Sequence, residues 1–81
     1  MAESIKVFTS VGWGPCHMVK VYLSRKDIPF EEVNVSGNRE GVMRLLALGR
    51  NTTPVTTIGE EVIVGYKPKD IDAALETTGI V

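Results

Sequence analysis

The order in which strand-like and helix-like segments follow one another constrains this chain more than any other feature of its sequence. Residues 5–9 are rich in β-branched and aromatic side chains, which predicts a short buried strand. Two glycines interrupt this pattern, and from Pro15 to about Lys26 the apolar residues recur with a helical period. Residues 30–35 then alternate apolar and polar side chains, as a second strand does. Strand, helix and strand in this order favour a parallel pair joined by a right-handed crossover.

A second helix-like segment follows. Asn38 is placed to cap it and Gly49 to end it. Between them, Val42, Leu45 and Leu46 form one apolar face. We expect this face to cover one side of the sheet.

The last third of the chain predicts two strands and a helix. Residues 55–58 and 61–64 are strand-like and are joined by two turn residues, which predicts an antiparallel hairpin. The final helix begins near Pro68 and ends at Gly79. The order is therefore βαβαββα. It predicts one α/β domain over residues 1–81, with helices on both faces of a four-stranded mixed sheet, because the first strand has the pattern of a buried one.

Composition and charge exclude several classes of function. Nine Lys and Arg side chains balance ten Asp and Glu, without a long run of one sign, which argues against nucleic acids and anionic membranes as partners. The chain has no apolar stretch of membrane-spanning length and no leader-like N-terminus, so we expect a cytoplasmic protein. The sequence offers no evidence for a stable oligomer, so we expect a monomer. One cysteine and one histidine cannot supply an internal disulfide or a zinc site, and we expect no cofactor.

The sequence Trp13-Gly14-Pro15-Cys16 lies between the first strand and the first helix. The helix dipole and the unpaired N–H groups of a first helical turn favour a nucleophilic thiolate there. Cys16 also shares an apolar helix face with Val19 and Leu23, and free cysteine is among the most buried residue types. A reactive thiol and an inert, half-buried thiol are therefore both open.

This region resembles the glutaredoxin family and, within it, the NrdH-type redoxins. The family pattern is a strand ending in Tyr or Phe, a four-residue loop, and Cys-x-x-Cys at the start of a helix. Here Phe8 is followed by residues 9–12 and then by the Trp13–Cys16 motif. By this resemblance, Cys16 takes the place of the second cysteine and Trp13 that of the first. A thioredoxin-type Trp-Cys-Gly-Pro-Cys without its first cysteine is another possible alignment, and it also leaves Cys16 in the second position.

Two further motifs carry the resemblance over essentially the whole chain. Thr53-Pro54-Val55 is similar to the family's Thr/Val-Pro-Val segment, whose proline is cis and faces the redox site. Gly65-Tyr66-Lys67-Pro68 resembles the corresponding segment of NrdH-type redoxins and departs from the Gly-Gly-x-Asp segment with which glutaredoxins bind glutathione. The resemblance implies a thioredoxin fold, and glutathione is a less favoured partner than a protein disulfide.

The resemblance also implies thiol–disulfide exchange as the activity, and it implies that this activity is impaired. In the family, the first thiolate attacks a disulfide, the second cysteine resolves the mixed disulfide, and a reductase restores both thiols. Ribonucleotide reductase and thioredoxin reductase are the partners that the NrdH-type redoxins suggest. Because an indole cannot attack a disulfide, we expect an impaired thiol–disulfide oxidoreductase in which Cys16 is the catalytic residue.

A redox-inactive module that binds proteins or peptides on the same scaffold is the alternative, and a dimer joined through Cys16 is a third possibility. In the first two cases, the residues expected to bind the substrate or partner are Trp13, Gly14, Pro15, Thr53, Pro54, Val55, Gly65 and Tyr66.

Overall fold

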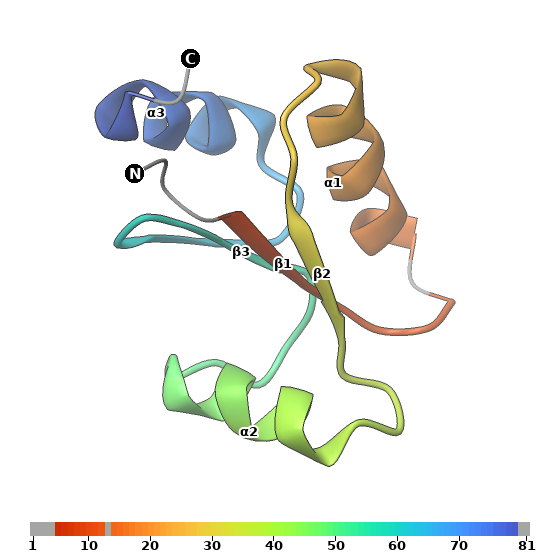
Figure 1. Ribbon diagram of the computed structural model, residues 1–81. Helices are drawn as coiled ribbons and strands as arrows, with labels where there is room; N and C mark the ends of the chain where they lie inside the picture. The colour runs from red at the N-terminus through yellow and green to blue at the C-terminus, as the bar shows by residue number, and fades with distance from the viewer. Residues whose placement is uncertain (1–4, 13, 80–81) are drawn as a thin grey trace.

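The predicted order of elements is confirmed. A computed structural model describes residues 5–12 and 14–79 of the chain (Figure 1). Its elements are β1 (Ile5–Thr9), α1 (Gly14–Arg25), β2 (Glu31–Asn34), α2 (Arg39–Ala47), β3 (Val55–Ile58), β4 (Glu61–Val64) and α3 (Pro68–Thr78). Within these described residues, every helix falls short of the length and apolarity that a membrane crossing requires.

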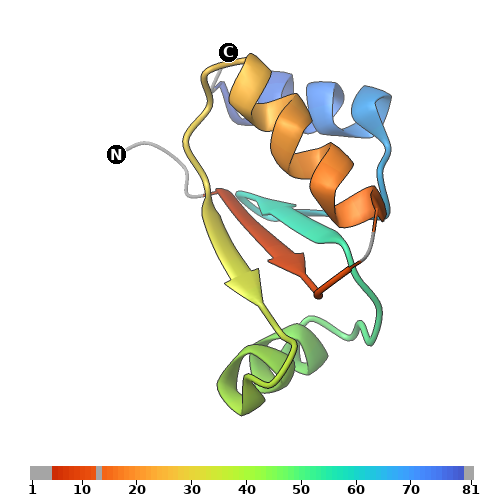
Figure 2. The same cartoon turned by 90° about the vertical axis from the view of Figure 1, so that its right-hand side faces the viewer.

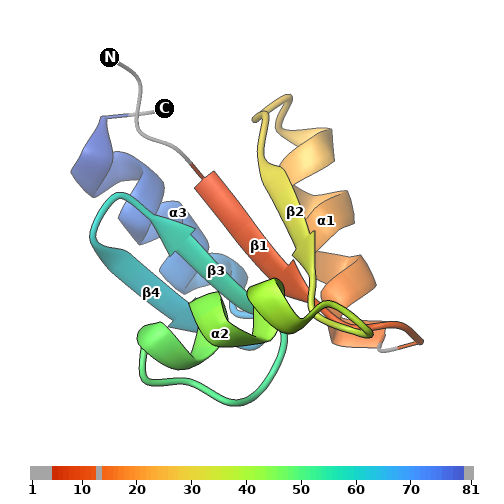
Figure 3. The same cartoon turned by 60° about the horizontal axis from the view of Figure 1, so that its bottom comes forward.

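The strands form one mixed sheet in the order β2-β1-β3-β4 (Figure 3). β1 and β2 are parallel, whereas β3 is antiparallel to both of its neighbours, β1 and β4. The predicted parallel pair, β1 with β2, and the predicted antiparallel hairpin of β3 and β4 are therefore confirmed. β1 is an inner strand, which explains why every residue of it except Lys6 is buried.

Helices cover both faces of the sheet. α1 and α3 lie on one face and α2 lies on the other (Figure 2). Because side chains alternate along a strand, β1 sends Val7 into the larger core beneath α1 and α3, and Phe8 into the smaller core beneath α2. In the larger core, Leu23 of α1 and Leu75 of α3 are completely buried.

The ends of α2 follow the predicted chemistry. The Asn38 side-chain oxygen accepts a hydrogen bond from the Gly41 N–H at 3.0 Å, which satisfies one of the free donors of the first turn. After the helix, Gly49 adopts a φ of 78°, a left-handed conformation that glycine adopts without steric cost.

The predicted apolar face of α2 is wrong in one respect. Only Leu45 of that face is buried, whereas Val42 is 38% exposed and Leu46 is 52% exposed. The helix instead contacts the sheet through Gly41 and Leu45, four residues apart on one row. Val42 and Leu46 each lie one residue further on, about 100° around the helix, and so point away from that contact.

Candidate redox site

The residues singled out in the sequence gather at one end of the sheet. There β1 ends and the chain enters α1, while β3 begins and β4 ends (Figures 1 and 3). The strand register pairs Phe8 with Val55 and Val55 with Val64, which places these three strand ends side by side. The topology therefore brings the start of α1, the segment before β3 and the segment after β4 to a common edge.

Cys16 lies in the first turn of α1. Its side chain is only 2% exposed and shares the buried face of the helix with Val19 and Leu23, as the apolar periodicity predicted. His17, the next residue, is exposed. A thiol buried in this way has little access to a disulfide substrate. Trp13 lies outside the described residues, so its predicted role stays a prediction.

The Thr53–Pro54 peptide bond is cis, as the resemblance implied. Pro54 is buried, and its carbonyl oxygen accepts a hydrogen bond from the Gly65 N–H at 2.8 Å. Gly65 has a φ of 88°, which favours glycine at this position. On the other side, the hydroxyls of Thr53 and Ser10 are hydrogen-bonded at 2.7 Å. The proline segment is thus tied both to the end of β4 and to the loop after β1.

Tyr66 is half-buried and packs edge-on against Tyr22 of α1, with 6.2 Å between the ring centroids. The Tyr22 hydroxyl in turn donates a hydrogen bond to Asp72 of α3 at 2.6 Å, and Lys26 lies 3.4 Å from the same carboxylate. The hydrogen bond to Asp72, with smaller effects of burial and of the carboxylate charge, raises the pKa of Tyr22 to about 12. The same bond lowers the pKa of Asp72. This cluster joins α1 to α3 and holds Tyr66 beside them.

A polar network that the sequence analysis missed joins α1 to the edge strand β2. Thr9 is 2% exposed, and its hydroxyl donates a hydrogen bond to Glu32 at 2.7 Å. The Lys20 ammonium lies 3.1 Å from the same carboxylate oxygen. The hydrogen bond from Thr9, followed by that from Lys20, lowers the pKa of Glu32. Lys20 is four residues after Cys16, so the network lies about one helical turn from the thiol.

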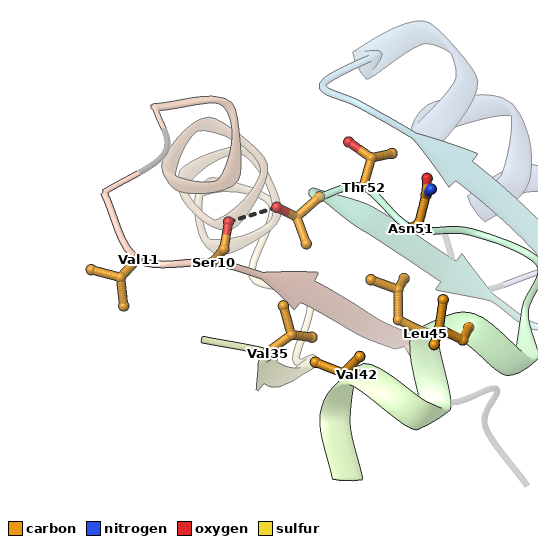
Figure 4. A pocket seen from close by; sticks show the side chains of 9 residues that line it. Ser10, Val11, Val35, Val42, Leu45, Asn51 and Thr52 are labelled. Carbon is orange, nitrogen blue, oxygen red and sulfur yellow. Dashed lines mark hydrogen bonds between the residues drawn. The ribbon is translucent and has the colours of Figure 1, made fainter. Parts of the chain in front are cut away.

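An open cleft of about 440 Å³ adjoins this end of the sheet on the α2 side (Figure 4). Its lining residues are Ser10, Val11, Val35, Val42, Leu45, Leu46, Asn51, Thr52 and Thr53. Of the predicted partner-binding residues, the cleft includes Thr53. For the lining residues on α2, the sequence signal was the predicted apolar face of Val42, Leu45 and Leu46.

Comparisons with known proteins agree with this geometry. The family model described as Glutaredoxin matches residues 5–63. The glutaredoxin-like protein NrdH of Lactococcus lactis subsp. lactis (strain IL1403) is 28% identical over 67 residues, which cover 83% of this chain and 93% of that protein. The SPbeta prophage-derived thioredoxin-like protein YosR of Bacillus subtilis (strain 168) is 40% identical over 68 residues, which cover 76% of this chain and 81% of the relative.

A solved structure is similar throughout the fold. NrdH-redoxin from Escherichia coli, described as a glutaredoxin-like protein with a thioredoxin-like activity profile, superposes with a TM-score of 0.78 at 27% identity. The superposition covers 86% of this chain and 92% of that one. The mixed four-stranded sheet with three flanking helices is the thioredoxin fold, and the chain belongs to the glutaredoxin family, with NrdH-type redoxins among its relatives.

Proposed function

We propose that this chain is a thiol–disulfide oxidoreductase whose exchange chemistry is impaired. The observation that carries the proposal is the position of its one thiol. Cys16 occupies the second cysteine position of the family motif and is 2% exposed, while the first position holds Trp13. A redoxin normally attacks with the exposed first thiolate, and this chain has none there.

The chemistry left to Cys16 is a single exchange step. Its thiolate attacks one sulfur of a substrate disulfide, a new S–S bond joins the two proteins, and the other substrate sulfur leaves as a thiolate. Since the chain has no second cysteine, nothing within it can break the mixed disulfide. Turnover then depends on an external thiol.

We propose the partners of this chain from its similarity to NrdH-type redoxins. Its relatives include NrdH-type redoxins, one of which is described by a thioredoxin-like activity profile. By the resemblance to NrdH-type redoxins, the proposed substrates are protein disulfides, with ribonucleotide reductase as a candidate, and the proposed electron donor is a thioredoxin reductase. Glutathione is disfavoured because the segment from Gly65 to Pro68 lacks the family's glutathione-binding pattern. The proposed setting is the cytoplasm, where a lone thiol stays reduced, with the chain acting as a monomer.

The test compares the chain with its Cys16→Ser variant on an insulin disulfide substrate, in the presence of excess dithiothreitol. We expect slow reduction by the parent chain and none above background by the variant. Mass spectrometry after addition of a disulfide reagent should show one adduct, on Cys16. Equal activity of both proteins would show that the cysteine carries no chemistry.

A second candidate, the redox-inactive binding module, is favoured by the burial of Cys16. The rate of alkylation separates the two. If iodoacetamide modifies Cys16 in the folded chain at pH 6 within minutes, the thiol is activated and the oxidoreductase stands. If Cys16 reacts only after unfolding in guanidinium chloride, the scaffold functions by binding.

A further inference from the structure

A second cleft, of about 580 Å³, lies on the α2 face of the sheet, toward the turn between β3 and β4 and away from the redox site. Figure 3 shows α2 crossing the end of the sheet where β1 stops and β3 starts, with the turn of the β3–β4 hairpin beyond the helix. Across these strands the register aligns Lys6 with Thr57 and Thr57 with Val62, and all three are only half-buried. We call this the hairpin cleft. Its lining residues are Lys6, Phe8, Arg44, Ala47, Leu48, Thr57, Gly59, Glu60 and Val62.

Lys6 is the residue of the hairpin cleft that the fold does not explain. It belongs to the inner strand β1, whose other residues are all buried. Because side chains alternate along a strand, it shares the α2 face of the sheet with Phe8. Within the described part of the chain, the salt bridges are formed by Lys20, Lys26 and Arg44 and do not include Lys6. A half-buried cation without an acidic partner has lost part of its hydration, and a bound anion can offset that loss.

Arg44 supplies a second cation, and its position is fixed. Its guanidinium lies over the Phe8 ring, 5.8 Å from the ring centroid, and 3.9 Å from the carboxylate of Glu31. Glu31 stands beside Lys6 in the strand register but is paired with Arg44, and it offsets part of the Arg44 charge from outside the lining. The lining itself contains one carboxylate, Glu60 at the hairpin turn. The two cations of the lining therefore exceed its acidic residues by one, although the whole chain carries a net charge of −1.

We infer that the hairpin cleft binds a small organic monoanion, a carboxylate carried on a flat apolar body such as an aromatic ring. The ring lies on the sheet surface between Val62 and Leu48, which is 37% exposed, and the carboxylate faces Lys6 and Arg44. A guanidinium matches the planar geometry of a carboxylate, and Glu60 disfavours a second negative charge. The cleft volume lies in the range of small-molecule sites. This inference goes beyond the proposed function and does not depend on it, because the hairpin cleft is separate from the redox site.

The experiment titrates the full chain with naphthylacetate and, as a matched neutral ligand, with naphthylacetamide. Binding is followed by the amide chemical shifts in proton–nitrogen correlation NMR spectra, which also locate the ligand. We expect the carboxylate to bind with a Kd of about 1 mM or tighter, and at least about fivefold more tightly than the amide. The largest shifts should occur at Thr57 and Val62. Naphthyl phosphate, which can carry a second negative charge, should bind no more tightly than the carboxylate. Salt should reduce the difference between carboxylate and amide, because it screens Lys6 and Arg44.

Matched variants separate the charge from the apolar wall. Lys6→Gln removes the charge and keeps most of the side chain, so it should weaken the carboxylate at least about threefold and leave the amide unchanged. Lys69→Gln is its control, because Lys69 is exposed on α3 and does not line the cleft. Leu48→Ala should weaken both ligands alike, by about threefold. Met43→Ala, at a position on α2 that is 62% exposed and outside the lining, should weaken neither. Circular dichroism confirms that each variant folds.

Three results overturn the inference. The first is equal affinity for the carboxylate and the amide, or no saturable shift up to about 10 mM of the carboxylate. The second is an equal loss in Lys6→Gln and Lys69→Gln, because the anion is then attracted by the charge of the chain and not by the cleft. The third is a set of largest shifts at Asn51 and Thr53, because the ligand then occupies the cleft beside the redox site. Failure of the insulin assay alone refutes the proposed exchange chemistry and leaves the hairpin cleft in place.

Discussion

Replacing Thr56 by valine should stabilise the protein. Thr56 lies on β3, an inner strand, and its side chain is completely buried on the face covered by α1 and α3. In the register of the sheet it stands between Val7 and Ile63, both of which belong to the larger apolar core. Among the described residues, its hydroxyl oxygen is buried and has no hydrogen-bond partner.

The magnitude follows from that environment. A buried hydroxyl without a partner costs about 1–3 kcal/mol, and valine has nearly the same shape and an equal preference for strands. In a domain of this size, 1 kcal/mol shifts the melting temperature by about 4–8 °C, so Thr56→Val should raise it by roughly 5–20 °C. Urea denaturation followed by circular dichroism measures the same change as free energy of unfolding.

Thr57→Val is the matched control. Thr57 is the next residue, faces the other side of β3 and is partly exposed, so its change should stay within about 0.5 kcal/mol. If Thr56→Val leaves the protein unchanged or destabilises it, the hydroxyl is satisfied in solution and the reasoning from its burial fails.

Two further predictions concern the elements around the site. The pKa of Tyr22 is about 12 in the folded chain, above its ordinary value of 10, so the stability from its hydrogen bond to Asp72 is complete below pH 10 and is lost as the pH rises from 10 to 12. Urea titrations in this range should show a steeper loss of stability for the parent chain than for Tyr22→Phe, and parallel curves would contradict the assignment. Asn38→Ala removes the side-chain oxygen that accepts from the Gly41 N–H and should lower the free energy of unfolding by about 0.5–2 kcal/mol, whereas Asn38→Asp, which keeps an acceptor, should lower it less.

Most of the fold could be predicted because local signals and tertiary packing agree. Asn38 and Gly49 mark the ends of α2 through chemistry that acts within a few residues. The triplet of Cys16, Val19 and Leu23 faces the core because α1 presents a single apolar row to the sheet. For these elements the spacing of apolar residues was sufficient.

The face of α2 could not be predicted in the same way. Its sequence offers two neighbouring rows, Gly41 with Leu45 and Val42 with Leu46, and the second is the more apolar. The structure buries the first row, where Gly41 lets the helix approach Val33 of β2 closely: a Cβ at this position would lie 3.2 Å from the Val33 side chain. Which row packs depends on that tertiary fit, which is not visible in periodicity.

In the candidate site, too, some features could be predicted from the sequence and others could not. The cis bond before Pro54 followed from the family resemblance, because nothing in the local sequence distinguishes it from a trans proline. Tyr22 donates a hydrogen bond to Asp72, 50 residues further along the chain, and Thr9 donates one to Glu32, 23 residues further along. Pairs this far apart cannot be predicted from the spacing of residues in the sequence. Long-range polar pairs of this kind required the structure.

The central claim is that this redoxin lacks its attacking thiol, and restoring that thiol tests it most directly. The measurement is NADPH-dependent reduction of an insulin disulfide with thioredoxin reductase, comparing the parent chain, Trp13→Cys, and Trp13→Ser as the control for loss of the indole. We expect strong activity in Trp13→Cys alone, and loss of that activity when Cys16→Ser is added. If Trp13→Cys is folded and as inactive as the parent, or if the parent is already as active as the variant, the claim that a missing nucleophile limits this protein is contradicted.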